Sequence, residues 1–214
     1  MHDRRDHHPA VVRVCHWTIA LALAVVIPSG LEVFAAFPSF GDKIPQIDLI
    51  VPPSALRLGG WLGGALQWHV TFAWLLTMAM ASYIGYQAIT RNGRQVLFVT
   101  RDIGGVCPMV RHYLFLGPKP AIAEIYNPLQ KMAYSAVVLL ALLGILTGFA
   151  LYKPVHLSWL VDAMGGFRMV RVWHFAATCG VLAFIPGHLV MVALHGWRNF
   201  ASMWTGSHEA HGKE

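Results

Sequence analysis

Charged residues are scarce in this sequence. Only 12% of the 214 residues are Asp, Glu, Lys or Arg, whereas 56% are hydrophobic. A soluble domain carries roughly a quarter charged residues, so most of the surface of this chain cannot face water. The composition therefore excludes an ordinary soluble domain and predicts an integral membrane protein.

A basic stripe suited to nucleic acid is also lacking. The formal charge is +6, but the 16 Lys and Arg residues are scattered among long apolar runs and are not interleaved with aromatic residues in one stripe. We therefore expect no nucleic-acid partner.

Cysteine motifs are missing as well. The three cysteines, Cys15, Cys107 and Cys179, lie far apart and none belongs to a C-x-x-C spacing. This pattern gives no zinc ribbon, no iron–sulfur site and no covalent C-x-x-C-H haem attachment. Any haem must be bound non-covalently.

Four apolar segments are long enough to cross a hydrocarbon core of roughly 30 Å, which takes about 20 residues. They cover roughly 13–36, 64–89, 129–151 and 170–196. The Pro- and Gly-rich link before the second segment cannot be a fifth span. We therefore predict an all-α fold: a single integral membrane four-helix bundle over residues 1–214, with membrane lipid around it.

The first segment also has features of a secretory signal. Arg4 and Arg5 precede an apolar stretch, and small residues follow it. However, cleavage would remove a pattern of Arg13 and His16 that recurs near the C-terminus. We therefore interpret the segment as the first membrane helix, with a cleaved signal as the alternative.

Lys and Arg residues are distributed unevenly over the two sides of the predicted bundle. If both termini lie inside, the inner side carries 11 of the 16: Arg4, Arg5, Arg13, Arg91, Arg94, Arg101, Arg111, Lys119, Lys131, Arg198 and Lys213. The outer side carries five: Lys43, Arg57, Lys153, Arg168 and Arg171. Because cytoplasmic segments carry the excess, we expect an N-in, C-in orientation.

Four of the twelve histidines fall inside the predicted spans: His16, His69, His174 and His188. An ionisable side chain at membrane depth is expensive and indicates a functional site. The other histidines lie in the tails, in the links or at the inner end of the last span. For those in tails and links, the ordinary interpretation is a solvated or interfacial side chain.

His174 and His188 are separated by 14 residues on the fourth predicted helix. This spacing places them on one face, about 40° apart around the axis and roughly 21 Å apart along it. His16, near the inner end of the first helix, and His69, near the outer end of the second, supply a partner at each level. Two imidazoles from facing helices suit a low-spin haem iron that transfers electrons. We predict one haem between His16 and His188 and another between His69 and His174.

Two kinds of neighbouring residue fit this pairing. Arg13 and Arg171 each precede a predicted ligand by three residues, which places a cation one turn outward, where a haem propionate would emerge. Gly30 and Gly180 lie where a flat macrocycle would press on the backbone. Alternatively, these glycines let helices approach closely.

Two other interpretations of the four histidines stay open. The imidazoles could be hydrogen-bonded between helices, or they could form the proton relay of a transporter. A relay would need intramembrane acids. The second, third and fourth spans contain none, and Glu32 lies near the outer end of the first.

Several motifs resemble those of the di-haem membrane cytochrome b subunits of respiratory oxidoreductases. This group includes the anchors of thiosulfate reductase, nickel–iron hydrogenase and formate dehydrogenase, and the thiosulfate reductase type is the most similar. The motifs are R-V-C-H-W at 13–17, W-H at 68–69, Y-N-P-L-Q-K at 126–131, L-T-G at 146–148, and the spacing of the last two histidines. The resemblance covers about Val12 to Gly206.

The distribution of histidines separates this group from other di-haem membrane cytochromes, which place two on each of two helices. Here the residues 14 positions beyond His16 and His69 are Gly30 and Tyr83. The sequence differs from members of the group at Pro28 and Ser29. The sequence alone indicates no functional consequence of this difference.

The resemblance implies an electron-transfer subunit of a bacterial inner membrane. Such subunits exchange electrons with an outer-face catalytic subunit, a molybdenum or metal-cluster oxidoreductase, and with quinone near the inner haem. Asn127 matches a position implicated in quinone binding, and Lys131 lies at the same end of the third helix. A quinone carbonyl needs a hydrogen-bond donor. Asn127 also suits helix capping before Pro128, and the two roles are compatible.

Two rival functions remain at this stage. The first is a chain that acts alone as a quinone reductase or oxidase and uses a small outer-face redox partner such as superoxide, with the same haems. A passive anchor without redox work would show no haem spectrum.

We expect two non-covalent b-haems per chain, because the sequence offers two imidazole pairs and no C-x-x-C-H. Acid–acetone extraction of the purified protein should release all the haem, and quantitation should give two haems per polypeptide. One haem per polypeptide, or haem that resists extraction, would contradict the predicted pairs.

Overall fold

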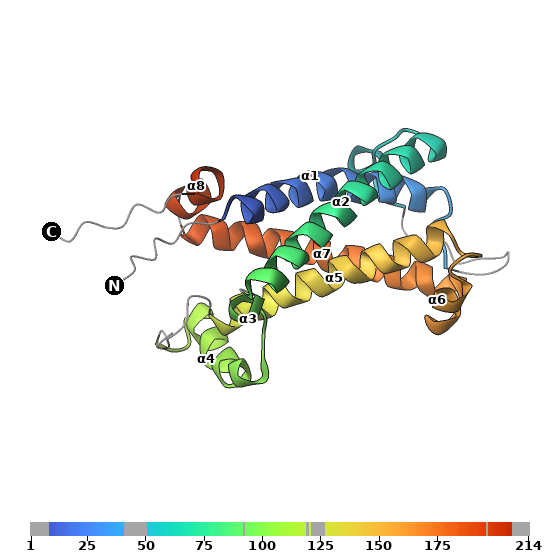
Figure 1. The fold of residues 1–214 in the computed structure, drawn as a ribbon. Coiled ribbons are helices and arrows are strands. Elements are labelled where there is room, and N and C mark those ends of the chain that lie inside the picture. Colours follow the sequence, from blue (N-terminus) through green and yellow to red (C-terminus); the bar gives the residue numbers. More distant parts are fainter. Residues whose placement is uncertain are drawn as a thin grey trace. The chain divides into compact units, whose positions relative to one another are not determined.

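The computed structural model describes residues 9–40, 51–91, 93–118, 120, 127–195 and 197–206. Within them the chain forms helices, turns and loops and no strand, which confirms the predicted all-α fold (Figure 1). Among the basic residues used to predict orientation, Arg4, Arg5, Lys43, Lys119 and Lys213 lie outside the described residues.

Four long helices carry most of the chain. They are α1 (Ala10–Ala35), α2 (Leu62–Thr90), α5 (Pro128–Tyr152) and α7 (Phe167–His195). Among the described residues α1, α5 and α7 are long and apolar enough to cross a membrane. α2 has the length too, at 29 residues or about 43 Å. That α2 crosses the membrane stays a prediction.

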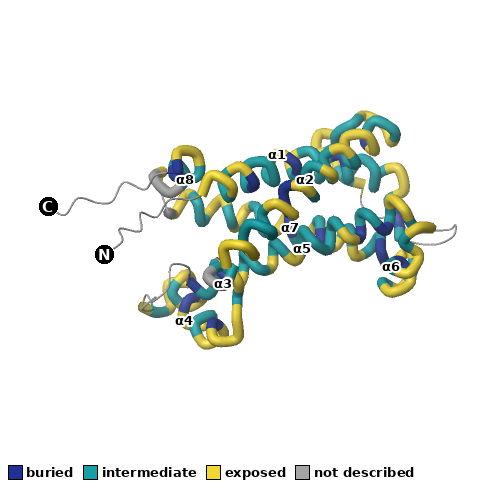
Figure 2. The backbone as a smooth tube through the Cα atoms, in the orientation of Figure 1, coloured by how far each residue is buried: buried dark blue, intermediate teal, exposed yellow. Residues whose placement is uncertain are grey.

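Large apolar side chains face outward along these helices. Leu21 on α1, Leu139 on α5 and Leu189 on α7 are 57%, 66% and 60% exposed. Figure 2 shows such exposed positions along the long helices, not only at their ends. Exposing these side chains to water would be unfavourable, whereas lipid chains are as apolar as leucine. The exposed surface therefore fits a membrane environment.

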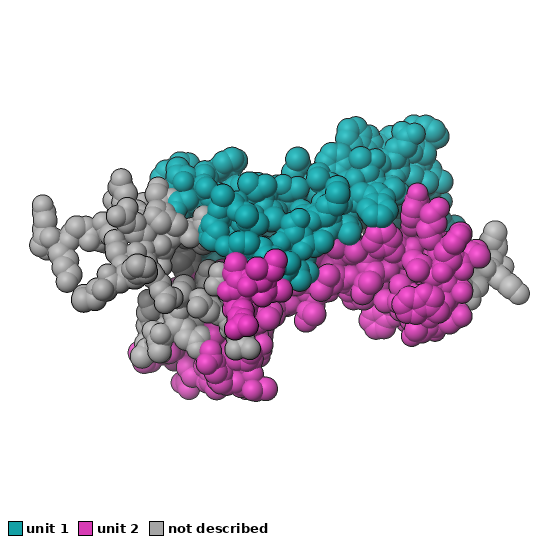
Figure 3. Space-filling view, in the orientation of Figure 1, with its two compact units in different colours: residues 1–86, 185–214 teal, residues 87–184 magenta. Residues whose placement is uncertain are grey.

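The chain divides into two compact units, which Figure 3 colours separately. The first unit comprises residues 1–86 and 185–214, and the second comprises residues 87–184. α7 contributes residues to both units.

In the first unit, short segments cover the two ends of α1. Near its first turns lies α8 (Trp197–Thr205): the Trp17 indole donates to the Met203 carbonyl at 3.0 Å and stacks on Trp204 with ring centroids 4.1 Å apart. At the other end, Arg57 forms a 3.2 Å ion pair with Glu32. Glu32 is therefore neutralised by a cation at the end of its helix.

In the second unit, α6 (Ser158–Ala163) joins α5 to α7. A small apolar core unites the three helices through Ala150, Val161 and Val170, and partly buried Leu151, Leu160 and Met164 pack against it. The link before α5 is more structured than the sequence indicated. It contains α3 (Gly93–Val96), the 3-10 turn η2 (Thr100–Asp102) and the amphipathic α4 (Ile103–Tyr113).

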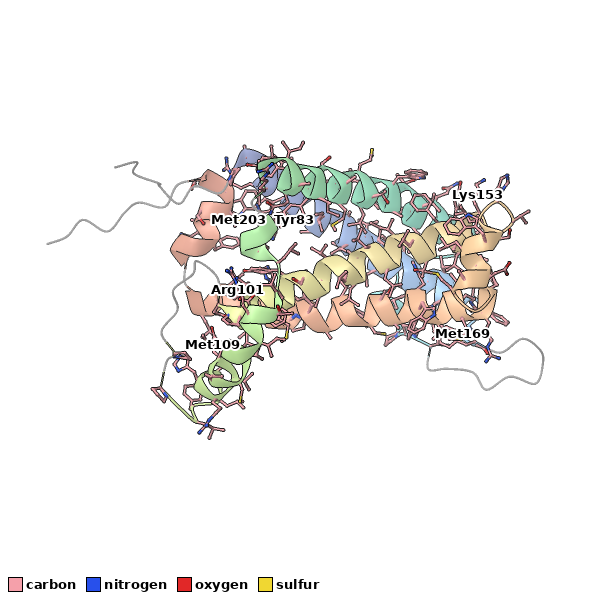
Figure 4. The ribbon with its side chains drawn as sticks, turned by 60° about the horizontal axis from the view of Figure 1, so that its bottom comes forward. Tyr83, Arg101, Met109, Lys153, Met169 and Met203 are labelled. Carbon is pink, nitrogen blue, oxygen red and sulfur yellow. The ribbon has the colours of Figure 1, made fainter. Side chains whose placement is uncertain are left out.

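Figure 4 places these segments along α5. Arg101 and Met109 lie beside its first turns, whereas Lys153 and Met169 lie beside its last turn. Met109 is buried at 2% exposure, so α4 turns its apolar face inward. The two ends of α5 are thus packed by different elements, and its first end carries the predicted site residues Asn127 and Lys131.

Candidate functional site

His16 on α1 and His188 on α7 face each other inside the first unit. Their ring centroids are 6.1 Å apart and the rings are tilted by 52°. Two imidazoles that share one iron, each with a metal–nitrogen bond of about 2.0 Å, have ring centres roughly 6 Å apart. The spacing of this pair therefore fits a bis-histidine haem iron, and both side chains are half-buried.

Arg13 lies one turn before His16 and is half-buried. Its guanidinium donates a hydrogen bond to the Trp204 carbonyl on α8. A guanidinium carries five N–H donors, so this contact leaves capacity for a propionate. The α8 contact was not apparent from the sequence, because 191 residues separate its two partners.

His69 on α2 is held by α1 through its Nδ1 atom. Nδ1 lies 3.0 Å from the Val26 carbonyl oxygen and 3.4 Å from Ser29 Oγ. A carbonyl oxygen only accepts hydrogen bonds, so Nδ1 must carry the hydrogen. In this tautomer the other ring nitrogen, Nε2, is the one that would bind an iron.

His174 on α7 has a comparable contact with α5 in the second unit. Its Nδ1 atom lies 2.9 Å from Thr147 Oγ1. The Thr147 hydroxyl donates to the Leu143 carbonyl at 2.6 Å, so its oxygen accepts from the imidazole. In this tautomer Nε2 of His174 is again the nitrogen that would bind an iron. Arg171 lies one turn before it and is half-buried.

These tautomers fit b-haem ligation at His69 and His174. In haem and other metal sites, a ligating histidine donates its second N–H to a protein acceptor, which fixes the ring. His69 belongs to the first unit and His174 to the second. Their pairing around one iron stays a prediction from the sequence.

Gly30 and Gly180 each lie close to a side chain of a neighbouring helix. A Cβ atom at Gly30 would lie 3.0 Å from Cε1 of His69, and one at Gly180 would lie 2.8 Å from the Leu140 side chain. The space beside them therefore belongs to an imidazole and a leucine. Glycine lets a side chain of another helix approach closely at both positions, and contact of either glycine with a macrocycle stays a prediction.

Sequence reasoning missed the hydroxyl residues that hold the imidazoles. Ser29 and Thr147 are fully buried, and each directly precedes a glycine, Gly30 or Gly148. This repeated pair of a hydroxyl residue and a glycine inside two apolar helices was the available signal. A buried hydroxyl needs a hydrogen-bond partner. Each pair of a hydroxyl residue and a glycine therefore indicates a position that faces another polar group.

Asn127 is the N-cap of α5. Its Oδ1 accepts from the Gln130 amide at 2.9 Å, and the Gln130 side chain accepts from the Asn127 amide at 3.0 Å. Pro128 occupies the first helical position, as capping predicts. The Asn127 amide nitrogen also contacts the Tyr113 hydroxyl at 3.4 Å. The capping role is therefore observed, and one amide hydrogen remains for another acceptor.

Lys131 forms a buried ion pair that the sequence did not reveal. Its Nζ lies 3.3 Å from Asp102 Oδ1, and the two side chains are 1% and 8% exposed. The Val99 amide donates to Asp102 Oδ2 at 2.9 Å, and this bond together with the Lys131 ammonium holds the pKa of the Asp102 carboxyl below its usual value. The pair ties η2 to the first turn of α5.

Comparison with known proteins gives matches along most of the chain. A model of the prokaryotic cytochrome b561 family matches residues 7–206. The putative protein-methionine-sulfoxide reductase subunit YedZ1 of Azospira oryzae is 31% identical over 189 residues, which cover 87% of this chain and 90% of that protein.

Two more distant relatives have hydrogenase names. The probable Ni/Fe-hydrogenase 1 B-type cytochrome subunit of Escherichia coli is 24% identical over 199 residues, covering 85% of this chain and 79% of that protein. The probable Ni/Fe-hydrogenase B-type cytochrome subunit of Cupriavidus necator is 25% identical over 202 residues, covering 85% and 76%. All three relatives are named as subunits.

Asn127 can be tested as a cap and as a quinone ligand with two variants. Asn127→Ala should lower the free energy of unfolding by about 1 kcal/mol and weaken binding of a quinone analogue, with both haems retained. Asn127→Asp keeps the capping oxygen but loses the amide donor, so it should weaken only analogue binding. Thermal unfolding and analogue titration separate the effects. Unchanged affinity in Asn127→Asp would leave Asn127 with the capping role alone.

The ion pair should make stability depend on pH. Because the folded-state pKa of Asp102 is lowered, the pair stabilises the fold at neutral pH, and this contribution should disappear as the pH falls through that pKa. Lys131→Met should lower the melting temperature by leaving a buried carboxylate unpaired, and adding Asp102→Asn should recover part of the loss. Lys153→Met, at an exposed position, is the matched control. Equal melting temperatures for Lys131→Met and Lys153→Met would contradict the prediction.

Proposed function

Because the chain belongs to the prokaryotic cytochrome b561 family, we propose that it is a membrane-anchoring electron-transfer subunit. It moves electrons between an outer-face oxidoreductase partner and the quinone pool through two bis-histidine b-haems. The observation that carries this proposal is the 6.1 Å spacing of the His16 and His188 rings. A bound b-haem would supply one-electron transfer between its ferrous and ferric states.

On the inner side, His16 and His188 would hold the haem by their imidazoles. A haem iron held by both imidazoles would have no site left for a substrate, so this pair suits electron transfer rather than chemistry at the iron. Arg13, half-buried one turn away, would compensate a propionate charge. Trp17 packs against α8 beside this arginine and anchors the end of the helix.

On the outer side, His69 and His174 would hold the second haem, and Arg171 would compensate its propionate. α7 is continuous from Phe167 to His195, so His174 and His188 lie roughly 21 Å apart along it. This separation puts one ligand near each membrane surface. With the N-in, C-in orientation, electrons would cross the inner membrane between the two levels.

The outer partner would be a molybdenum or metal-cluster oxidoreductase. Relatives of the chain are named as subunits of a protein-methionine-sulfoxide reductase and of Ni/Fe-hydrogenases. These names support a catalytic partner that performs the substrate chemistry, while this chain supplies the membrane passage. Co-purification tests this point. A tightly held metal-containing subunit is the expected result, and quinone turnover by the isolated chain with a small oxidant or reductant would favour the free-standing enzyme instead.

Quinone would meet the chain at the inner end of α5. Asn127 has an amide hydrogen beyond the one directed at Tyr113, and it would donate this hydrogen to a quinone carbonyl. Lys131 is already paired with Asp102, so its ammonium would act on the quinone only as part of that pair. Reduction of a quinone to a quinol takes up protons, and oxidation of the quinol releases them. The ion pair places a carboxylate and an ammonium, which are both groups that exchange protons, at this helix end.

The two haem levels should respond in opposite ways to loss of a ligand. His69→Ala should remove the outer haem and abolish electron exchange with an outer donor, whereas the inner haem should remain and be reduced by added quinol. His16→Ala should spare reduction of the outer haem by the donor but block passage to quinone. Stopped-flow spectra with donor and quinol offered separately measure both effects.

His156→Ala, at an exposed position in the link after α5, is the control and should change neither haem. Two outcomes would show that the assigned pairs or the orientation are wrong. One is loss of the same haem signal in both ligand variants. The other is continued electron passage from donor to quinone in His69→Ala.

A further inference from the structure

The same local arrangement of residues occurs twice in the described part of the chain, once in each unit. In each case a buried hydroxyl residue followed by glycine lies against the Nδ1–Cε1 edge of a predicted haem ligand on another helix. Ser29 and Gly30 on α1 contact His69, and Thr147 and Gly148 on α5 contact His174. We propose that Ser29 and Thr147 are positioning residues that orient these imidazoles and lower the potential of the haem they hold. This inference rests on the proposed function.

The direction of each hydrogen bond follows from the number of hydrogens. A hydroxyl has one hydrogen to donate. Ser29 Oγ directs it to the Val25 carbonyl at 2.7 Å, and Thr147 Oγ1 directs it to the Leu143 carbonyl at 2.6 Å. Each oxygen therefore faces the imidazole as an acceptor. The histidine must donate from Nδ1, so Nε2 is the nitrogen that would bind the iron.

The glycines fix the ring from a second direction. A Cβ atom at Gly30 would lie 3.0 Å from Cε1 of His69, and one at Gly148 would lie 3.4 Å from Cε1 of His174. Both distances are at or below ordinary contact, so the ring edge rests on helix backbone. A hydroxyl at Nδ1 and backbone at Cε1 together restrict rotation of the ring about its Cβ–Cγ bond. The plane of each axial ligand is therefore set by the neighbouring helix.

An acceptor at Nδ1 also changes the ligand electronically. A hydrogen bond from Nδ1–H raises the basicity of the ring, and a more basic ligand favours the ferric over the ferrous state. Hydrogen bonding around the ligands is one of the means by which proteins tune haem potentials. Removing the acceptor should therefore raise the midpoint potential of the haem.

The two sites should not respond equally. His69 Nδ1 is 3.0 Å from the Val26 carbonyl and 3.4 Å from Ser29 Oγ, so its main acceptor is backbone. His174 Nδ1 is 2.9 Å from Thr147 Oγ1. Loss of Thr147 should thus have the larger electronic effect, while loss of Ser29 should act mainly on ring orientation.

The test is a redox titration of the purified, haem-loaded chain with its low-spin electron paramagnetic resonance spectrum. Thr147→Val should raise the midpoint potential of the haem that is lost in His69→Ala. We expect a threefold to tenfold change in its oxidised-to-reduced ratio, the upper value being about 59 mV for one electron. Ser29→Ala should give a smaller rise with a changed spectrum. The conservative variants Thr147→Ser and Ser29→Thr should restore wild-type values, and the other haem should keep its potential throughout.

Thr77→Val is the matched control, because the Thr77 hydroxyl donates to the Ala73 carbonyl four residues earlier on α2, as the positioning hydroxyls do on their own helices. An equal shift in Thr77→Val, or an unchanged potential and spectrum in Thr147→Val, would overturn the proposal. If Thr147→Val loses the haem, retention in Thr147→Ser supports the hydroxyl role and loss in both variants overturns it. Failure of the proposed function would give a different result: the His69→Ala variant would keep all the haem of the wild type.

Discussion

An imidazole at membrane depth needs partners for both ring nitrogens, because hydrocarbon supplies neither a hydrogen bond nor a charge. This requirement accounts for the arrangement around His69 and His174. Each imidazole gives its Nδ1 hydrogen to an acceptor on a neighbouring helix, which fixes the tautomer of the ring. The helices that carry the acceptors must come close, which explains why glycine follows the hydroxyl residue in both.

The remaining polar groups are satisfied at or near the helix ends. Asn127 caps α5, and Lys131 pairs with Asp102 one turn further on. Glu32, near the opposite membrane face in the predicted topology, pairs with Arg57. These contacts keep the paired charges near the helix ends, whereas the central turns carry apolar side chains, histidines and hydroxyl residues such as Thr77. Electron transfer through such a chain depends on this division, because unpaired charges near the haems would alter their potentials.

Much of this organisation could be predicted from residues and spacing. The resemblance to membrane cytochrome b subunits is confirmed by the family match over residues 7–206. The 14-residue spacing on α7 placed two histidines on one face, and the 6.1 Å contact of His16 with His188 supports the inner pair. The sequence did not indicate that the His69 imidazole lies beside Gly30. Spacing along one helix gives depth and face, but it does not give the atom that lies opposite.

By itself the sequence determined the class of the protein, its long helices and the histidines at membrane depth. Composition and helical periodicity are local properties, and they can be read along one segment. Only the tertiary structure decided which side chains meet: Thr147 with His174, Ser29 with His69, and Lys131 with Asp102. Contacts between helices depend on how each helix is rotated and offset against its neighbour. No spacing within a single segment specifies that rotation, so these partners became visible only in three dimensions.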